Sequence, residues 1–329
     1  MRYLLGIDIS KSSFHAAFLD TAGSDGPQHG EFPNDAAGFQ QLSEWLERLS
    51  SSGSATGSPV TVHACMEATG RYYEALACFL HQAGHRVSVV NPTCIAHYAR
   101  SKLLRNKTDK IDAATIADFA RTQNPRAWTP PSPQLKQLQA LTHQLDALKK
   151  MKTQETNRLK AAPPDKNVQK VIREHLHFLE QQNQTLIQQL DSLAKDAPFQ
   201  RQVQLLTSIP GIGKLTAYRL IAEGITRFDS SRQLAAYAGL SPRHHESGTS
   251  VKRKEALSKV GNARLRAALY WPAISAKRWN PALAAFVERL ESKHKPNKLI
   301  TAAVMRKLLC LAFAVLKADK PFDPAYQPH

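Results

Sequence analysis

The sequence predicts an α/β domain followed by an all-α region, and three observations support this fold class. Up to about residue 125, short apolar runs alternate with helical patterns, which is typical of a mixed sheet covered by helices. The proline-rich segment "NPRAWTPPSP", Asn124 to Pro133, breaks this pattern. Beyond it, leucines recur at helical spacing. We expect three domains, at residues 1–125, 126–199 and 200–329.

The first domain begins with strands and continues with alternating helices and strands. Apolar runs of strand length predict the strands "YLLGIDIS", "FHAAFLD", "HGEFPN", "VTVHACMEATG" and "HRVSVVNP". A helical spacing of Phe39, Leu42, Trp45, Leu46 and Leu49 predicts the helix "DAAGFQQLSEWLERL". A second helix, "RYYEALACFLHQAG", ends at its glycine. The third, "TDKIDAATIADFAR", begins with a threonine that can cap it and with acids suited to its first turn.

Two long helices are predicted after the proline-rich break. Their leucines recur at helical spacing on either side of a turn at "AAPPDK": Leu135, Leu138, Leu141, Leu145 and Leu148, then Leu176, Leu179, Leu186, Leu190 and Leu193. An antiparallel hairpin satisfies both halves of this pattern. Its apolar seam is narrow, so we expect it to pack on another copy as a coiled coil. A bundle within one chain is the alternative. From about Gln200 onward, the chain is predicted to be helical apart from a Gly/Ser-rich loop near 239–250.

The composition indicates a globular protein with a polyanionic partner. The chain has 329 residues, 42% of them hydrophobic, and a formal net charge of +17. The backbone of a nucleic acid is the natural counterpart of so large an excess of positive charge. A soluble basic protein without such a partner is the alternative at this stage.

The cysteines and the N-terminal segment indicate a reduced, cytoplasmic protein. Cys65, Cys78, Cys94 and Cys310 are far apart, which predicts neither a disulfide framework nor a zinc site. The first apolar run is too short for a signal peptide and contains Asp8. We expect no apolar stretch of transmembrane length.

Four acidic residues share a position at the end of a strand or the start of a helix: Asp8, Glu67, Asp109 and Asp112. The carboxyl ends of neighbouring strands meet at one edge of a sheet, where sites form. Asp109 and Asp112, three residues apart on one helix, point the same way. Such a group of carboxylates is tolerable if one or two Mg²⁺ ions lie among them, and such ions support phosphodiester chemistry. The alternative for each acid taken singly is a helix cap or a solvated charge.

Basic residues around these acids suit a nucleic-acid backbone. Those near the acids are Arg100, Lys102, Arg105, Lys107 and Lys110. A second signal, "LLTSIPGIGKLTAYRLIAEG", is typical of a helix-hairpin-helix. In this motif Gly211 and Gly213 expose backbone N–H groups, and the helix starting near Lys214 attracts a phosphate. An ordinary turn closed by Pro210 and Gly211 is the alternative.

A Ser/Gly loop, "AGLSPRHHESGTSVKRK", lies among cations that include Arg243, Lys252 and Arg253. A serine hydroxyl there could attack phosphorus while the cations stabilise the developing charge. The residue chemistry alone does not choose among the candidates Ser241, Ser247, Ser250 and Ser258. The alternative for any of them is a turn former.

Taken together, these motifs resemble the DEDD transposases of the insertion-sequence one-ten family, which are related to the Piv/MooV DNA invertases. "GIDIS", "MEATG" and "RNKTDKIDA" resemble its RuvC-like, RNase H-type domain. "SIPGIGKLTA", "QLAAYAGLSPRHHESGTS" and "SKVGNARLRAALY" resemble its C-terminal transposase domain. By this resemblance Asp8, Glu67, Asp109 and Asp112 are the Mg²⁺-binding tetrad, and the family's serine falls on Ser247.

The resemblance implies a recombinase of the bacterial cytosol, associated with the nucleoid, that joins DNA transiently to a serine and rejoins it elsewhere. It also implies an element-encoded bridge RNA that pairs donor with target, and homodimers that assemble into a tetramer. Two alternatives remain. One is a RuvC-like, structure-selective endonuclease that hydrolyses DNA junctions, and the other is a nucleic-acid-binding scaffold with a degenerate site.

Overall fold

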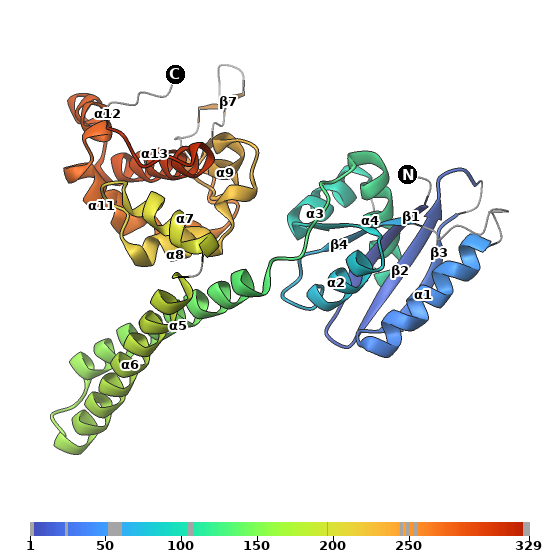
Figure 1. Ribbon diagram of the computed structural model, residues 1–329, viewed down its shortest axis with the longest axis horizontal. Helices are drawn as coiled ribbons and strands as arrows, with labels where there is room; N and C mark the ends of the chain where they lie inside the picture. The colour runs from blue at the N-terminus through green and yellow to red at the C-terminus, as the bar shows by residue number, and fades with distance from the viewer. Residues whose placement is uncertain are drawn as a thin grey trace. The chain divides into compact units, whose positions relative to one another are not determined.

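The computed structural model describes residues 3–23, 26–51, 61–103, 108–195, 197–243, 246–247, 251–252 and 256–324. They form two compact units, Met1–Pro131 and Ser132–His329, and the boundary lies inside the predicted proline-rich break. The first unit contains a sheet with helices on it, and the second is mostly helical (Figure 1).

The first unit is built around a five-stranded sheet in the order β3-β2-β1-β4-β5. Its strands are β1 (Tyr3–Ile9), β2 (Ser13–Asp20), β3 (Gln28–Pro33), β4 (Val62–Glu67) and β5 (Arg86–Val90). The first three strands pair antiparallel, whereas β4 runs parallel to β1 and β5 runs parallel to β4. The five predicted strands and the mixed sheet are therefore confirmed.

Helices cover both faces of this sheet (Figure 1). Ile7 and Met66 belong to a core with Leu42 of α1 (Ala36–Ser51) and with residues of α2 (Glu74–Gln82). Cys65, which points to the opposite face, packs with Ile116 of α4 (Asp109–Gln123). A helix that the sequence analysis did not predict, α3 (Pro92–Ser101), also packs on that second face. Its N-cap is Asn91, whose side chain accepts the Thr93 N–H at 2.9 Å.

The start of α4 is fixed over β1 by a close contact at Gly6. A Cβ atom on Gly6 would lie 2.1 Å from the carbonyl oxygen of Ala113 and 2.3 Å from the amide nitrogen of Ala117. Both are backbone atoms of α4, so they cannot move aside as the end of a flexible side chain could. The absence of a side chain at Gly6 therefore allows α4 to lie directly on the strand.

Replacing Gly6 with alanine should separate α4 from β1. We expect Gly6→Ala to lower the free energy of unfolding by about 2 kcal/mol or more, since the added methyl group overlaps backbone atoms. Urea denaturation followed by circular dichroism measures the loss. Gly26→Ala is the matched control because a Cβ there has nothing within 4 Å. Equal stability of the two variants would contradict the close contact.

His63 of β4 is a buried polar group whose environment favours its neutral form. Its Nε2 lies 2.8 Å from the Ser88 hydroxyl, which in turn donates to the carbonyl oxygens of Pro125 and Arg126. Burial, with the nearby positive charge of Arg86, lowers the pKa of His63 from 6.5 to about 4. In mild acid His63 therefore binds a proton in the unfolded chain but not in the folded chain.

This difference in pKa predicts a loss of stability in mild acid. Between pH 6.5 and about 4 the unfolded state binds the His63 proton and the folded state does not, so the free energy of unfolding falls as the pH decreases. We expect His63→Gln to show a smaller loss than the parent protein between pH 7 and pH 5 in urea titrations. His177→Gln, on the exposed side of α6 (Lys166–Leu193), should keep the parental slope. An unchanged slope in His63→Gln would refute this assignment.

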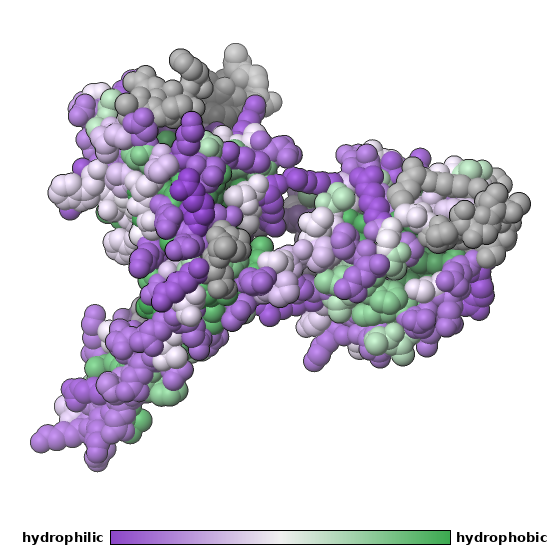
Figure 2. Space-filling view, viewed as in Figure 1, coloured by the Kyte–Doolittle hydropathy of each residue, from purple (hydrophilic) through white to green (hydrophobic). Residues whose placement is uncertain are grey.

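The second unit begins with the predicted antiparallel hairpin, formed by α5 (Pro133–Ala161) and α6 (Figure 1). Ser132 caps α5 and Asp165 caps α6 through side-chain oxygens that accept backbone N–H groups. The buried seam contains leucines of both predicted sets: Leu138, Leu145, Leu148, Leu179, Leu190 and Leu193. Figure 2 shows a mostly hydrophilic surface along this hairpin, interrupted by hydrophobic patches.

The rest of the second unit is a helical body with a short β-structured loop. Its helices are α7 (Ala197–Thr207), α8 (Lys214–Ala222), η1 (Ile225–Arg227), α9 (Ser231–Tyr237), α10 (Ala263–Ala268), α11 (Tyr270–Trp279), α12 (Pro281–Ser292) and α13 (Asn297–Ala318). The loop contains two-residue strands: β6 (Pro242–Arg243), β7 (Glu246–Ser247), β8 (Val251–Lys252) and β9 (Ala256–Leu257). The expected helical fold of this region is confirmed.

One expectation about this region is wrong, because α13 does reach transmembrane length. It has 22 residues and is apolar enough to cross a membrane by length and composition. Its role as the central helix of the body explains this composition. Buried residues such as Ile300, Leu308 and Phe313 belong to the same core as α7, α8 and α11. A core helix covered on several sides needs apolar residues around most of its circumference.

Candidate active site

The candidate site is a row of polar side chains that crosses the sheet on the face covered by α3 and α4. Asp8 of β1 pairs with His15 of β2, and His15 pairs with Glu31 of β3. Ile7 pairs with Met66, so Glu67 follows on β4 beside Asp8. Side chains at paired positions point to the same face. The row across neighbouring strands is therefore Glu31, His15, Asp8 and Glu67.

Asp109 approaches this row from the start of α4. Thr108 caps the helix by accepting the Ile111 N–H at 3.3 Å, as predicted. One oxygen of Asp109 lies 3.7 Å from Nδ1 of His15, and Nε2 of His15 lies 3.4 Å from Glu31. The His15 side chain is only 18% exposed, whereas that of Asp109 is 67% exposed. Asp112 is half-buried in the same first turn.

The charge of Glu67 acts on its neighbours on this face. Burial raises the pKa of the Cys65 thiol to about 12, and the negative charge of Glu67 contributes to the increase. Cys65 precedes Glu67 by two residues, so both side chains lie on the face covered by α4. The thiol therefore stays protonated and serves as a small core residue.

The donor chemistry of the row suits a hard divalent cation. The carboxylates of Asp8 and Glu67 lie on adjacent strands and are both half-buried, and oxygen is the ligand atom that Mg²⁺ prefers. In the described part of the chain, no three His, Cys, Asp or Glu side chains form a group that could hold a metal ion as they stand. The structure thus brings Asp8 beside Glu67 and Asp109 to His15, without closing the four acids into one cage.

The serine loop of the second unit is closed at its base by backbone pairing. β6 pairs with β9, and β7 pairs with β8 inside it. Ser247 lies in β7 opposite Val251. At the base the Ser258 N–H donates to the carbonyl oxygen of Ser241 at 3.0 Å. The Ser258 hydroxyl accepts the Val260 N–H at 3.3 Å, which is the geometry of a turn former.

A polar cluster behind this base fixes its conformation. Asn262 donates to the carboxylate of Glu223 and to the Tyr237 hydroxyl, and its oxygen accepts the Leu265 N–H that starts α10. Burial alone would raise the pKa of Glu223, but hydrogen bonds from His143 and Asn262 lower it overall. Glu223 is thus held as a charged acceptor beneath the loop.

Comparison with known proteins identifies the family to which this chain belongs. A family model described as "Transposase", for DEDD transposases of the IS110 type, matches residues 5–162. A second, described as "Transposase IS116/IS110/IS902 family", matches residues 203–288. The pilin gene-inverting protein of Moraxella bovis is 37% identical over 325 residues, which cover 97% of each chain.

The chain belongs to the IS110 family of DEDD transposases. The pilin gene-inverting protein of Moraxella lacunata is also 37% identical over 97% of both chains. The transposase for insertion sequence element IS1328 of Yersinia enterocolitica is 25% identical over 97% of this chain and 98% of its own. The protein is therefore a DNA transposase or recombinase that cleaves strands, and DEDD chemistry implies a divalent metal.

The predicted DNA-binding residues lie in different settings within this IS110-family chain. Arg100 is exposed at the end of α3, and Lys102, just after it, pairs with Asp118 of α4 at 3.2 Å. Arg243 is exposed in β6, and Lys252 belongs to β8. Others lie outside the described residues: Arg105, Lys107 and Arg253.

The predicted helix-hairpin-helix turn has a packing role as well as an exposed end. Gly211 has a φ of +103°, and a Cβ there would lie 2.7 Å from the Ala276 Cβ and 2.9 Å from the carbonyl oxygen of Pro272. Its bare backbone therefore packs against α11. Gly213 and Lys214 remain exposed at the start of α8.

Sequence reasoning missed several polar residues that the structure places in or behind these sites. His15 and Glu31 join the acidic row through strand pairing, while Glu223, Asn262 and His143 support the serine loop. A signal for His15 was present, because the spacing of the first two strands as a hairpin sets it opposite Asp8. The cluster at Glu223 joins segments 39 and 80 residues apart and left no local pattern.

Removing Asn262 should weaken the base of the serine loop. Asn262→Ala leaves the half-buried Glu223 carboxylate with His143 but without its amide donor, and it leaves α10 without its cap. We therefore expect a loss of about 1–3 kcal/mol in the free energy of unfolding. Urea denaturation gives the value. Asn167→Ala, at an exposed position in the first turn of α6, should change it little. A loss no larger than that of the control would mean that the cluster does not stabilise the fold.

Proposed function

We propose that this chain cuts and rejoins DNA with Mg²⁺ at Asp8, Glu67, Asp109 and Asp112 and with Ser247 as the covalent nucleophile. The observation that carries this proposal is the row on the sheet, in which Asp8 lies beside Glu67 while α4 brings Asp109 to it. Two acids from adjacent strands and two from the first turn of one helix would surround a cation once their side chains turned toward it. Both relatives from Moraxella are named for inverting a pilin gene, and inverting a DNA segment requires its strands to be cut and rejoined.

Each acid has a distinct part in this proposal. Asp8 and Glu67, half-buried on the sheet, would fix the position of the ion. The more exposed Asp109 would bind the ion from the solvent side. A bound divalent ion polarises the phosphodiester and lowers the pKa of an attacking oxygen. His15, held between Glu31 and Asp109, would keep the Asp109 carboxylate near the row.

In the covalent step, the oxygen of Ser247 attacks phosphorus while the bond from phosphorus to the leaving-strand oxygen breaks. The serine proton is lost to a base, and the leaving oxygen takes up a proton. The phosphodiester bond energy is kept in the serine linkage, so a strand hydroxyl can later attack it and release the serine. Exposed cations such as Arg243 at the loop would stabilise the charge that develops on phosphate.

The chain would hold nucleic acid mainly through its backbone. A net charge of +17 suits a long polyanion, and Gly213 and Lys214 present the start of α8 to solvent. Arg100, Lys102, Arg105, Lys107, Gly211, Lys252 and Arg253 complete the proposed contacts. We propose that a bridge RNA supplies sequence recognition by base pairing, which leaves the protein to grip backbones. This activity would take place in the bacterial cytosol.

Self-association through the hairpin fits the apolar residues that α6 exposes. Val168, Val171 and Phe178 are 44%, 65% and 52% exposed and recur at spacings of three and seven residues. This heptad-like stripe is what a second hairpin would cover. We propose that copies pair here as homodimers and that dimers assemble into a tetramer, in which the acids of one subunit act with the serine of another.

Removing an acid of the row should stop cleavage without stopping DNA binding. We expect Asp8→Asn, Glu67→Gln and Asp109→Asn each to slow Mg²⁺-dependent cleavage of element DNA by roughly a thousandfold, because each weakens the metal site. They should also reduce the rise in melting temperature that Mg²⁺ causes in the parent protein. Glu44→Gln, an exposed acid of α1 on the other side of the sheet, is the control. Parental cleavage in Asp8→Asn or Glu67→Gln would remove that residue from the site.

The serine assignment is tested by trapping the intermediate. With Mg²⁺ and element DNA, we expect a protein–DNA adduct on denaturing gels that is lost in Ser247→Ala. Ser258→Ala should keep the adduct, because that hydroxyl is engaged in a turn. Cleavage without any adduct, and equal in Ser247→Ala, would instead indicate a hydrolytic junction endonuclease. No metal-dependent cleavage in any form would leave only a binding protein.

A further inference from the structure

One helix of the second unit exposes tryptophans in a regular stripe. The chain has four tryptophans, and Trp45 and Trp128 pack against the core of the first unit. Trp271 and Trp279 of α11 are instead 74% and 73% exposed. They are eight residues apart on the same side of the helix, with exposed Ser275 and Arg278 between them. We call these four residues the tryptophan stripe.

The helix beneath the stripe is held rigidly. The opposite side of α11 is buried and packs on Gly211, as described above. Lys277 bonds to Glu291 at 2.7 Å and to Asn297 at 2.8 Å, which ties the end of α11 to α12 and α13. Buried Asn280, which directly follows Trp279, donates to the carbonyl oxygen of Pro210 at 3.0 Å. The tryptophans are thus presented on a fixed surface, and their exposure does not come from a loose segment.

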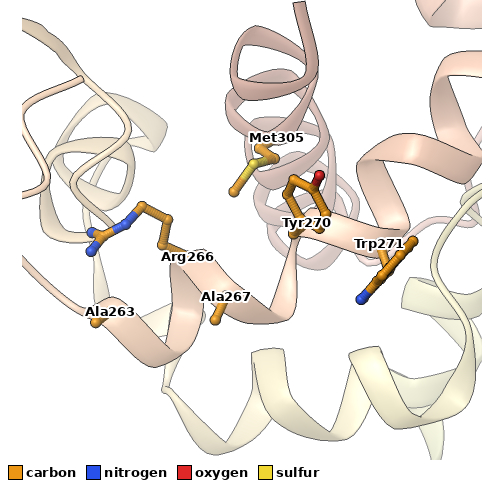
Figure 3. A pocket seen from close by; sticks show the side chains of 6 residues that line it. All are labelled: Ala263, Arg266, Ala267, Tyr270, Trp271 and Met305. Carbon is orange, nitrogen blue, oxygen red and sulfur yellow. The ribbon is translucent and has the colours of Figure 1, made fainter. Parts of the chain in front are cut away.

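An open pocket of about 490 Å³ adjoins the stripe at Trp271. Figure 3 shows Arg266 and Trp271 on either side of Ala267 and Tyr270, with Met305 of α13 above them. Ala267, whose side chain is small, lies between the Arg266 guanidinium and the Trp271 ring, and Ala263 also lines the pocket. One Arg266 nitrogen donates to the carbonyl oxygen of Ala238 at 2.9 Å, so this guanidinium is fixed in place.

We propose that the tryptophan stripe and this pocket bind unpaired nucleobases of a single-stranded nucleic acid by stacking. Exposed indole rings offer flat faces that unpaired bases can cover, whereas bases in a duplex present only their edges. Trp271 and Trp279 are roughly 12 Å apart along the helix, a distance of about three to four base steps at a 3.4 Å rise. Arg278 between them would meet the backbone phosphates.

The charges on this surface disfavour the main alternative, a contact between two copies of the chain. In a two-fold contact the same patch faces itself, so Arg278 would oppose its own copy in a chain that already carries +17. A polynucleotide supplies both flat rings and negative charge. This binding rests on the proposed function, because it requires a chain that acts on nucleic acid. The bound strands would be those that are unpaired while DNA is exchanged.

The test measures binding of fluorescein-labelled 20-nucleotide oligo(dT) and oligo(U) to the full chain in EDTA, by anisotropy. We expect Trp271→Ala and Trp279→Ala each to weaken binding about tenfold and the double variant by more. Phenylalanine at either position should keep affinity within about threefold, because a ring remains. Ser292→Ala, at an exposed position in α12 outside the stripe, should bind as the parent does. The two oligonucleotides show whether DNA or RNA is preferred.

Two further measurements decide against the proposal if it is wrong. A 20-base-pair duplex should bind the double variant within about twofold of the parent, since paired bases do not stack on the stripe. Folded double variants that bind oligo(dT) and oligo(U) as tightly as the parent would overturn the proposal. So would a fall in oligomer mass by light scattering with equal losses for duplex and single strand, which would indicate an interface between copies. Because EDTA prevents cleavage, failure here leaves the acidic site standing, and inactive Asp8→Asn should still bind the oligonucleotides.

Discussion

The contact between α4 and the bare backbone of Gly6 is the constraint on which the candidate active site depends. It fixes the helix so closely on β1 that its first turn, with Asp109 and Asp112, lies toward the end of the strand where Asp8 projects. Strand register supplies the rest. A slip of one residue would turn Asp8 and Glu67 toward the apolar core under α1 and α2, where their charges could not be accommodated.

The sequence predicted the parts of this site that depend on local pattern. The strands that carry Asp8 and Glu67 at or next to their last residue, the Thr108 cap and the acids of the first turn were all confirmed. Alternation, burial and capping leave signals within a few residues. His15 escaped notice since its place in the row comes from pairing with Asp8 across a hairpin. The role of Gly6 depends on a helix more than a hundred residues later.

In the helical unit, too, features with a local sequence pattern were predicted and contacts between distant segments were not. The hairpin and the turn at Gly211 were evident from leucine spacing and glycines, but the cluster of Glu223, Asn262 and His143 joins three separate segments and could not be foreseen. No apolar stretch of transmembrane length was expected, yet α13 is one. The reason is that a helix at the centre of a helical body can be as apolar as a membrane span. Residue patterns left several serines open, and the choice of Ser247 comes from family resemblance and stays a prediction.

The acids and the serine loop belong to different units, Met1–Pro131 and Ser132–His329, so the proposed reaction needs both units on the same DNA. In the proposed reaction the sheet would supply the metal site, the loop would supply the nucleophile, and α11 would hold unpaired strands. The proposed bridge RNA would then supply sequence recognition by base pairing, because contacts to the nucleic-acid backbone carry no sequence information.

A crystal structure with Mn²⁺ in place of Mg²⁺ would show whether Asp8 and Glu67 share one cation. We expect an anomalous difference peak within coordination distance of both carboxylates, with Asp109 or Asp112 as a further ligand. A peak bound by other residues, or well-ordered Asp8 and Glu67 side chains with no peak at saturating Mn²⁺, would contradict this expectation.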